Sequence, residues 1–313
     1  MTSLKSPMYS VVIPVFNEEE NLAELHARLL KVIRGYGNYE IIYIDDGCTD
    51  RSRSLIERFC SDNDEVKLIS LSRNFGHQPA VTAGLNYALG DVVAVMDADL
   101  QDPPEVLPEF FSQWQNGHQV VYAVRQKRRE PWYKKAAYFS YYRLLKILAE
   151  INIPLDSGDF CVMDRVVVDS LNELPEKNRF IRGIRAWVGF RQIGVTYERH
   201  ARFSGLPKYN LRKLLRLGYD GIFSFSKQPL VLSMRVGIIT TIISFLYIAL
   251  TLWRKLVYGV QPEGWTSLMI VVLFLGGIQL LMLGVLGEYV GRIFDETKGR
   301  PVYIISETIN IVQ

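Results

Sequence analysis

Three acidic residues follow an apolar run in the segment VVAVMDADLQDPPEV, which covers residues 92–106. Asp97, Asp99 and Asp102 stand close enough to repel one another, and the repulsion costs most where water is scarce. A bound cation offsets that repulsion, and hard divalent cations take carboxylate oxygens as ligands. The spacing therefore indicates a cation site at the end of a buried strand. Asp102 precedes two prolines, so a role as a cap or turn residue is equally consistent with its position.

Alternating strands and helices are expected to position these acids. Five apolar, β-branched runs recur, at residues 9–15, 40–44, 66–71, 91–96 and 119–124. Segments with helical periodicity separate them, including residues 21–33, 78–89 and 105–115. Continuous apolar runs that alternate with helices predict an α/β fold with a mainly parallel sheet covered on both faces. In such sheets ligands bind outside the carboxyl ends of the strands.

Polar residues gather at those strand ends. The segments are PVFNEE, DDGCTD, SRNFGHQ, DADLQDPP and VRQKRR. Taken singly, residues such as Asn17, Thr49 and Asp50 are also typical helix caps. Their occurrence at consecutive strand ends favours one shared binding edge.

Composition and charge exclude several functions. The 313 residues carry a formal net charge of +3, so bulk electrostatics give no argument for a nucleic-acid partner. Cys48, Cys60 and Cys161 are widely spaced and odd in number, which is typical of a reducing compartment rather than a disulfide framework or metal cluster. The apolar run near the N-terminus is short and interrupted by Pro14, so we interpret it as a strand and not as a cleavable signal.

Two long uncharged apolar stretches occupy residues 236–253 and 265–287. A membrane-spanning helix needs about 20 apolar residues, so both predict spans, the first with help from the PLVLSM segment before it. Two buried core helices are the alternative, which these lengths disfavour. The loop between the spans carries only Arg254 and Lys255, whereas more basic residues flank the outer ends: Arg212, Lys213, Arg216, Lys227, Arg235, Arg292, Lys298 and Arg300. This bias places the N-terminal part and the tail in the cytoplasm.

The segments VVIPVFNEEENL, YIDDGCTDRS, SLSRNFGHQPAVTAGLNYALGDVVAVMDADLQDPPE and VVYAVRQKRR resemble the inverting family-two glycosyltransferases of the GT-A fold. More narrowly, they are similar to dolichol-phosphate mannose synthases and bacterial undecaprenyl-phosphate (bactoprenol) glucosyltransferases. The resemblance implies a Rossmann-like cytoplasmic GT-A domain with interfacial helices over residues 1–228. It further implies two transmembrane helices with a short outer loop over 229–290 and a cytoplasmic tail over 291–313, in a multi-pass protein of the bacterial inner membrane with both termini cytoplasmic.

The resemblance also implies a donor site. Mg²⁺ or Mn²⁺ is expected on Asp97 and Asp99, with Gln101 near the metal. The nucleotide is expected to contact residues from three strand ends: Pro14, Phe16, Glu18, Asp45, Asp46, Asp97 and Ala98. The family usually has serine where this chain has Cys48, which we interpret as a buried small thiol with no catalytic role.

On the acceptor side the resemblance implies arginines that hold phosphate, since guanidinium forks match phosphate oxygens. Arg125, Arg128 and Arg129 follow the fifth strand, and Arg202 and Lys208 belong to an RFxGxxKY pattern. A solvated basic loop and unspecific attraction to anionic lipids are the alternatives for these two groups.

The segment PLDSGDFCVMDR resembles the family's TGDFRLMDR, in which the aspartate of GDF lies by the anomeric carbon. That residue is Asp159, with Asp156 as a second candidate, and Cys161 stands where the family often has arginine. Residues 131–150 and 201–226 are expected to lie in the membrane interface. Residues 179–190 are interpreted as an acceptor loop, in which Arg182 and Arg185 are weaker candidates.

The resemblance implies metal-dependent transfer of glucose from UDP-glucose to undecaprenyl or another polyprenyl phosphate, with inversion to a β-linked product. GDP-mannose, UDP-galactose or an amino-sugar nucleotide remain open as donors. A processive polysaccharide synthase is disfavoured because GIRAW lacks the QxxRW pattern. A non-catalytic membrane partner is disfavoured because Asp97, Asp99, Gln101 and Asp159 are all present. Small-residue runs such as LGGIQLLMLGVLG permit a homo-oligomer.

Overall fold

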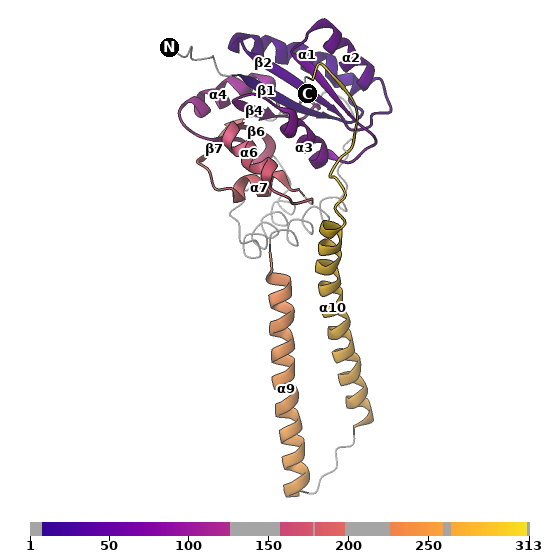
Figure 1. The fold of residues 1–313 in the computed structure, drawn as a ribbon. Helices are drawn as coiled ribbons and strands as arrows, with labels where there is room; N and C mark the ends of the chain where they lie inside the picture. The colour runs from indigo at the N-terminus through magenta and orange to yellow at the C-terminus, as the bar shows by residue number, and fades with distance from the viewer. Residues whose placement is uncertain (1–7, 126–156, 178, 198–225, 259–263, 312–313) are drawn as a thin grey trace. The chain divides into compact units, whose positions relative to one another are not determined.

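A computed structural model of the chain describes residues 8–125, 157–177, 179–197, 226–258 and 264–311 (Figure 1). The chain forms two compact units. The first contains the N-terminal part and also the last residues from Arg300 onward, and the second contains two long helices. The candidate acids Asp97, Asp99 and Asp159 all belong to the first unit.

The first unit is built on an eight-stranded sheet in the order β7-β5-β6-β4-β1-β2-β3-β8. The strands are β1 (Tyr9–Val15), β2 (Tyr39–Asp45), β3 (Val66–Leu71), β4 (Val92–Val95), β5 (Val120–Arg125), β6 (Ser157–Asp164), β7 (Gln192–Tyr197) and β8 (Ile305–Ile309). The five strands predicted from the apolar runs are confirmed to within one residue at each end. The sheet is mixed, because β6 runs antiparallel to β4 and β5 and β8 runs antiparallel to β3, while the other pairs are parallel.

Helices cover both faces of this sheet (Figure 1). They are α1 (Glu19–Ile33), η1 (Arg34–Tyr36), α2 (Ser52–Asp62), α3 (His77–Tyr87), η2 (Pro104–Val106), α4 (Leu107–Gln115), α6 (Arg165–Glu173) and α7 (Ile181–Trp187). Val11 and Ile13 of β1 join the core that α1, α2 and α4 cover. The intervening Val12 lies on the face covered by α3. Every residue of β1 is buried, which explains the continuous apolar run in place of an alternating pattern.

Gly84 allows α3 to approach the sheet closely. A Cβ atom at this position would lie 2.3 Å from Cγ1 of Val12 and 2.8 Å from Cδ1 of Ile44. No side chain larger than hydrogen fits there without a shift of β1, β2 or the helix. The tight seat of α3 fixes its first residue, His77, at the carboxyl edge of the sheet.

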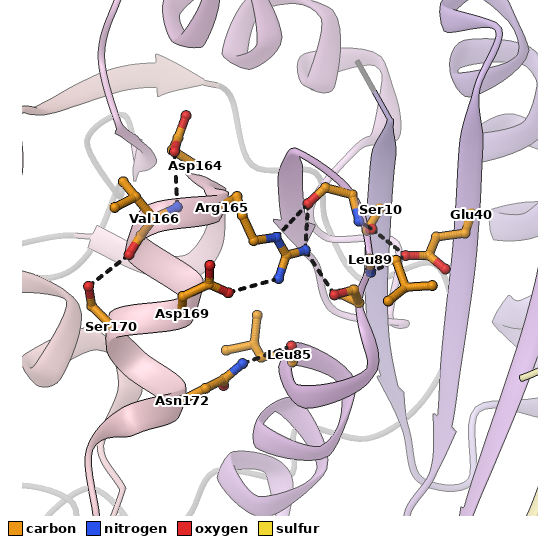
Figure 2. A network of polar contacts seen from close by, with 12 residues as sticks. Ser10, Glu40, Leu85, Leu89, Asp164, Arg165, Val166, Asp169, Ser170 and Asn172 are labelled. Atoms are coloured by element: carbon orange, nitrogen blue, oxygen red, sulfur yellow. Dashed lines mark hydrogen bonds and ion pairs between the residues drawn. The ribbon is translucent and has the colours of Figure 1, made fainter. Parts of the chain in front are cut away.

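A buried polar network holds the connection between α3 and β4 (Figure 2). The side chain of Glu40 on β2 accepts hydrogen bonds from the Ser10 hydroxyl, the Leu89 backbone N–H and the Lys67 ammonium. From the other side, the Arg165 guanidinium donates to the carbonyl oxygens of Ala88 and Gly90. Buried polar groups that satisfy one another specify a single arrangement, so this network fixes where β4 begins.

The C-terminal tail completes the sheet, because its strand β8 pairs with β3. The Ser72 N–H donates to the carbonyl of Ile304 at 2.9 Å, and β8 then pairs with β3. Beyond β8, the Asn310 amide donates to the carbonyls of Cys60 at 2.8 Å and Val66 at 2.9 Å. Asn310 has a φ of 58°, a left-handed conformation that asparagine tolerates better than most residues.

The second unit contains α9 (Gln228–Tyr258) and α10 (Trp265–Thr297), which contact each other (Figure 1). Both helices are long and apolar enough to cross a membrane, by their length and composition. Their large apolar side chains are mostly exposed in the chain itself, including Phe245, Leu256 and Leu280. An exposed apolar surface of this extent is typical of helices that lie in lipid.

Replacing Asn310 with alanine should destabilise the first unit. The variant loses two hydrogen bonds, each contributing about 1 kcal/mol, and places alanine in the left-handed region at a cost of about 1–2 kcal/mol. About 1 kcal/mol corresponds to a shift of roughly 2–4 °C in a domain of this size, so thermal melting of the full chain in detergent should fall by several degrees. Glu307→Gln, which removes only an exposed ion pair with Arg53, is the matched control and should melt close to the parent. Equal melting of the two variants would contradict the docked tail.

Candidate active site

The loops after β1, β2, β3 and β4 interlock at the carboxyl edge of the sheet, as predicted. The Asp46 carboxylate accepts backbone N–H bonds from Phe75 at 2.7 Å and from Gly76 at 3.0 Å. Gly47 has a φ of 73°, and a Cβ atom there would lie 2.6 Å from the backbone nitrogen of Asn74. The second and third loops are therefore held as one piece.

The residues predicted to bind the nucleoside lie on this edge. Phe16 is 40% exposed directly after β1, where an aromatic ring can stack against a base. Asp45 and Asp46 are buried, and Asp45 accepts a hydrogen bond from the Cys48 N–H at 2.8 Å. Burial raises the pKa of Asp46. The backbone N–H groups of Phe75 and Gly76 lower it, but by less than burial raises it. Both carboxylates thus have structural partners in addition to any contact with a ligand.

Pro14 and Glu18 frame the first of these loops. Pro14 is buried inside β1. The Glu18 backbone N–H donates to the Ser52 hydroxyl at 2.9 Å, and its carboxylate accepts from the Asn21 amide at 2.7 Å. Burial raises the pKa of the Cys48 thiol to about 12, so this cysteine is protonated at neutral pH and is no nucleophile.

The turn after β4 carries the two acids predicted to bind a metal. Leu100 has a φ of 59°, an uncommon conformation for a residue with a branched side chain that costs about 1–2 kcal/mol. Within this turn the Gln101 N–H donates to Asp99 at 3.1 Å, and Ala98 is buried beside them. Strained backbone held by buried neighbours is typical of a preorganised site.

Asp159 enters the same edge from β6. The Arg182 guanidinium of α7 donates to both of its carboxylate oxygens, from Nε at 3.3 Å and from Nη2 at 3.2 Å. Burial favours the neutral acid, but the positive charges of Arg182, His77 and Arg185 hold the pKa of Asp159 below its usual range. Asp159 is therefore an anion at neutral pH.

His77 is a site residue that the sequence analysis missed. Its Nε2 lies 2.8 Å from Oδ1 of Asp97, and it interacts electrostatically with Asp159. Burial alone would lower the pKa of His77, but Asp97 and then Asp159 raise it to about 9. The only sequence signal was its place in SRNFGHQ after the third strand, where a histidine also serves as an ordinary first residue of a helix.

Several residues predicted to bind substrate lie outside the described residues, and Asp102 has a contact within the protein. Asp156, Arg128, Arg129, Arg202 and Lys208 lie outside the described residues. Arg125 ends β5, and its side chain is not described. Asp102 is buried and accepts a hydrogen bond from the Tyr197 hydroxyl of β7. Pro103, and not Asp102, is the N-cap of η2.

The side chains of the turn after β4 can meet the needs of a divalent cation bound to a nucleotide. Within the described residues no group of three or more His, Cys, Asp or Glu side chains gathers as a closed metal cage. Mg²⁺ bound to a nucleotide needs no such cage, because it takes one or two carboxylates together with phosphate oxygens and water. Asp97 and Asp99, two residues apart on one turn, are hard oxygen donors of the required kind, so the residues fit the ion.

Comparison with known protein families identifies the chain as a glycosyltransferase. The family model described as "Glycosyl transferase family 2" matches residues 10–171, and the model "GtrB C-terminal hairpin" matches residues 228–293. The chain belongs to glycosyl transferase family 2, with a GT-A-like fold. The first match ends inside α6, and the second covers α9 and most of α10.

Curated relatives match over nearly the whole chain. The uncharacterized glycosyltransferase YkcC of Bacillus subtilis (strain 168) is 47% identical, covering 97% of this chain and 94% of its own length. The uncharacterized glycosyltransferase sll0501 of Synechocystis sp. is 44% identical, covering 95% of this chain and 94% of its own length. The SfII prophage-derived bactoprenol glucosyl transferase of Shigella flexneri is 41% identical, covering 96% and 97%.

Replacing Asp46 with asparagine should loosen the joined second and third loops. The amide keeps one acceptor but turns its NH₂ group toward a backbone N–H, which leaves a buried donor unpaired at a cost of about 1–3 kcal/mol. We expect a melting temperature several degrees lower than that of the parent chain. Asp169→Asn is the control, because it alters an exposed carboxylate that pairs with Arg165. Parent-like melting of Asp46→Asn would show that its bonds to Phe75 and Gly76 carry little stability.

Proposed function

We propose that this glycosyltransferase transfers glucose from UDP-glucose to undecaprenyl phosphate or a closely related polyprenyl phosphate. The observation that carries the proposal is the match to bactoprenol glucosyl transferases along almost the entire length of both chains. That match includes the Asp97–Asp99 turn, Asp159 and the apolar helical hairpin in one protein. A lipid phosphate acceptor explains why a nucleotide-binding edge and helices suited to a membrane occur together.

On the donor side, Asp97 and Asp99 would hold Mg²⁺ or Mn²⁺, with Gln101 beside them on the same turn. When bound, such an ion neutralises the negative charge that develops on the departing nucleoside diphosphate. Phe16, which is 40% exposed, would stack on the base. Asp45 and Asp46 would accept hydrogen bonds from base or ribose, because each carboxylate retains acceptor capacity beyond its backbone partners.

At the reacting carbon, an oxygen of the lipid phosphate attacks C1 of glucose while the bond from C1 to the diphosphate oxygen breaks. The electron pair of that bond leaves with the nucleoside diphosphate. A single displacement of this kind inverts the configuration at C1, so an α-linked donor gives a β-linked product. The acceptor phosphate is already largely anionic, so little proton transfer is needed. Asp159, held by Arg182, positions the reactants.

The hairpin supports a reaction at a membrane. The sheet contains both the strands that precede α9 and the strand β8 that follows α10, which supports an even number of crossings. Basic residues gather near the outer ends of the two helices, which favours the cytoplasmic face for the first unit. We therefore propose a two-span protein of the bacterial inner membrane with cytoplasmic termini, residues 1–228 forming the catalytic part.

The proposed reaction is tested with purified full chain, undecaprenyl phosphate, Mn²⁺ or Mg²⁺ and a panel of labelled nucleotide sugars. Label should enter the organic phase from UDP-glucose, and chelation of the metal should abolish it. Asp99→Asn should lower the rate by at least about 100-fold, because electrostatic stabilisation of the leaving group is lost. Asp169→Asn should keep the parental rate.

Label from GDP-mannose, UDP-galactose or an amino-sugar nucleotide instead would correct the donor and keep the acceptor. The absence of lipid label from every donor, with a folded and metal-supplied protein, would overturn the acceptor.

The proposed topology is tested by labelling with a membrane-impermeant maleimide in cells, in a Cys48→Ser background. A cysteine introduced by Glu263→Cys, between the helices, should react in intact cells. A cysteine introduced by Glu296→Cys, near the end of α10, should react only after permeabilisation. Reaction of both positions in intact cells would exclude a cytoplasmic tail.

A further inference from the structure

A second guanidinium lies close to the Asp159–Arg182 pair. It belongs to Arg185, which follows Arg182 by one turn of α7 and is only 1% exposed. Its charged group lies 5.3 Å from the centre of the Tyr122 ring and interacts with the thiol of Cys161. Its Nε and Nη2 atoms are buried and have no hydrogen-bond partner in the described part of the chain.

A buried guanidinium with unused donors is costly. Arginine stays protonated in proteins, so it cannot escape the penalty by losing its charge. The nearby carboxylate of Asp159 accepts two hydrogen bonds from Arg182 and none from Nε or Nη2 of Arg185. Native structures rarely leave such groups unsatisfied, and each case calls for a strain, ligand or catalytic explanation.

The two unused atoms form one edge of the guanidinium. Nε–H and Nη2–H point in the same direction, and this edge makes the paired bonds to a carboxylate or phosphate. Among the described residues, two other arginines bind a carboxylate through this edge. Arg28 donates from it to Glu105 at 2.8 and 2.6 Å, and Arg182 donates from it to Asp159. The unused edge of Arg185 is thus complementary to an anion with two oxygens.

We propose that this edge of Arg185 receives two oxygens of a substrate phosphate group during the reaction. The proposal rests on the proposed function, in which both the donor diphosphate and the acceptor supply phosphate close to Asp159. In this arrangement Arg182 donates hydrogen bonds to the carboxylate of Asp159, and Arg185 donates hydrogen bonds to the ligand phosphate. A phosphate group satisfies both unused donors at once and offsets the burial of their charge.

Cys161 supports this assignment of roles. Asp159 and Cys161 are two residues apart on β6, so their side chains lie on the same face of the sheet. Position 161 is where the family resemblance led us to expect arginine. Because the thiol of Cys161 is in contact with the Arg185 guanidinium, a guanidinium attached at position 161 would reach the same region. In this chain Arg185 on α7 supplies the positive charge that an arginine at position 161 on β6 would supply in the family.

The test uses three variants of the full chain. Arg185→Met removes the charge but keeps an apolar chain of similar length, and Arg185→Lys keeps the charge without the fork. The double variant Cys161→Arg with Arg185→Met moves the guanidinium from α7 to β6. Binding of UDP is measured by calorimetry with Mn²⁺, and binding of farnesyl phosphate by thermal shift, so neither readout depends on turnover.

Arg185→Met should weaken one of the two ligands about 10- to 100-fold, since bonds to charged groups are among the stronger hydrogen bonds. Without ligand it should melt at or above the parental temperature, because replacing a buried charge by an apolar side chain is often neutral or stabilising. A purely structural arginine would give the reverse pattern of lowered melting and parental binding. Arg185→Lys should bind with intermediate affinity, and the double variant should regain most of the lost affinity.

The two ligands separate the possible sources of the phosphate. Loss confined to UDP assigns Arg185 to the donor diphosphate, and loss confined to farnesyl phosphate assigns it to the acceptor. Parental affinity for both ligands in folded Arg185→Met would overturn the proposal. Because these are binding measurements, they remain decisive even when the labelling experiment detects no lipid product.

Discussion

The antiparallel insertion of β6 between β4 and β5 is the constraint on which the site depends. Val95 at the end of β4 is paired with Cys161 of β6. Continuing this antiparallel register by two residues brings Asp159 level with Asp97. A parallel strand in the same place would have carried its acid away from the edge where the other loops gather. β6 also pairs with β5, whose end carries Arg125, so one strand brings together residues proposed for the donor side and for the acceptor side.

Basic side chains of the protein offset part of the repulsion between the clustered acids. Asp97 is paired with His77, and Asp159 is paired with Arg182. These cations keep Asp159 ionised despite its burial, as the lowered pKa of its carboxyl shows. The repulsion that indicated a metal ion is therefore offset partly by side chains, and a bound ion would offset more of it. Asp102 accepts a hydrogen bond from the hydroxyl of Tyr197.

Strands β1 to β5 were predictable from the sequence because both of their faces are buried. A strand buried on both faces needs apolar residues at successive positions, so each appears as a continuous apolar run. The remaining strands leave weaker signals. β6 begins with SGD, β7 is only partly buried, and β8 is an edge strand with two exposed residues among five. The His77–Asp97 contact could not be predicted from the sequence either, because it depends on how closely Gly84 allows α3 to approach the sheet. The unused edge of Arg185 likewise depends on the packing of α7 and cannot be inferred from GIRAW.

The helical hairpin is an insertion within the first unit, and this has consequences for how the protein is made. β8 becomes available to pair with β3 only after both long helices have been synthesised. Until then the edge of β3 presents unpaired N–H and C=O groups, which in other proteins invite association. The partners of the tail explain how so short a strand holds its place: the backbone pairing is extended by Asn310, which satisfies carbonyls from α2 and from the start of β3. Because one sheet contains both strands that flank the hairpin, any odd number of membrane crossings would break the β3–β8 pair. The architecture thus makes an even number of crossings a condition of folding.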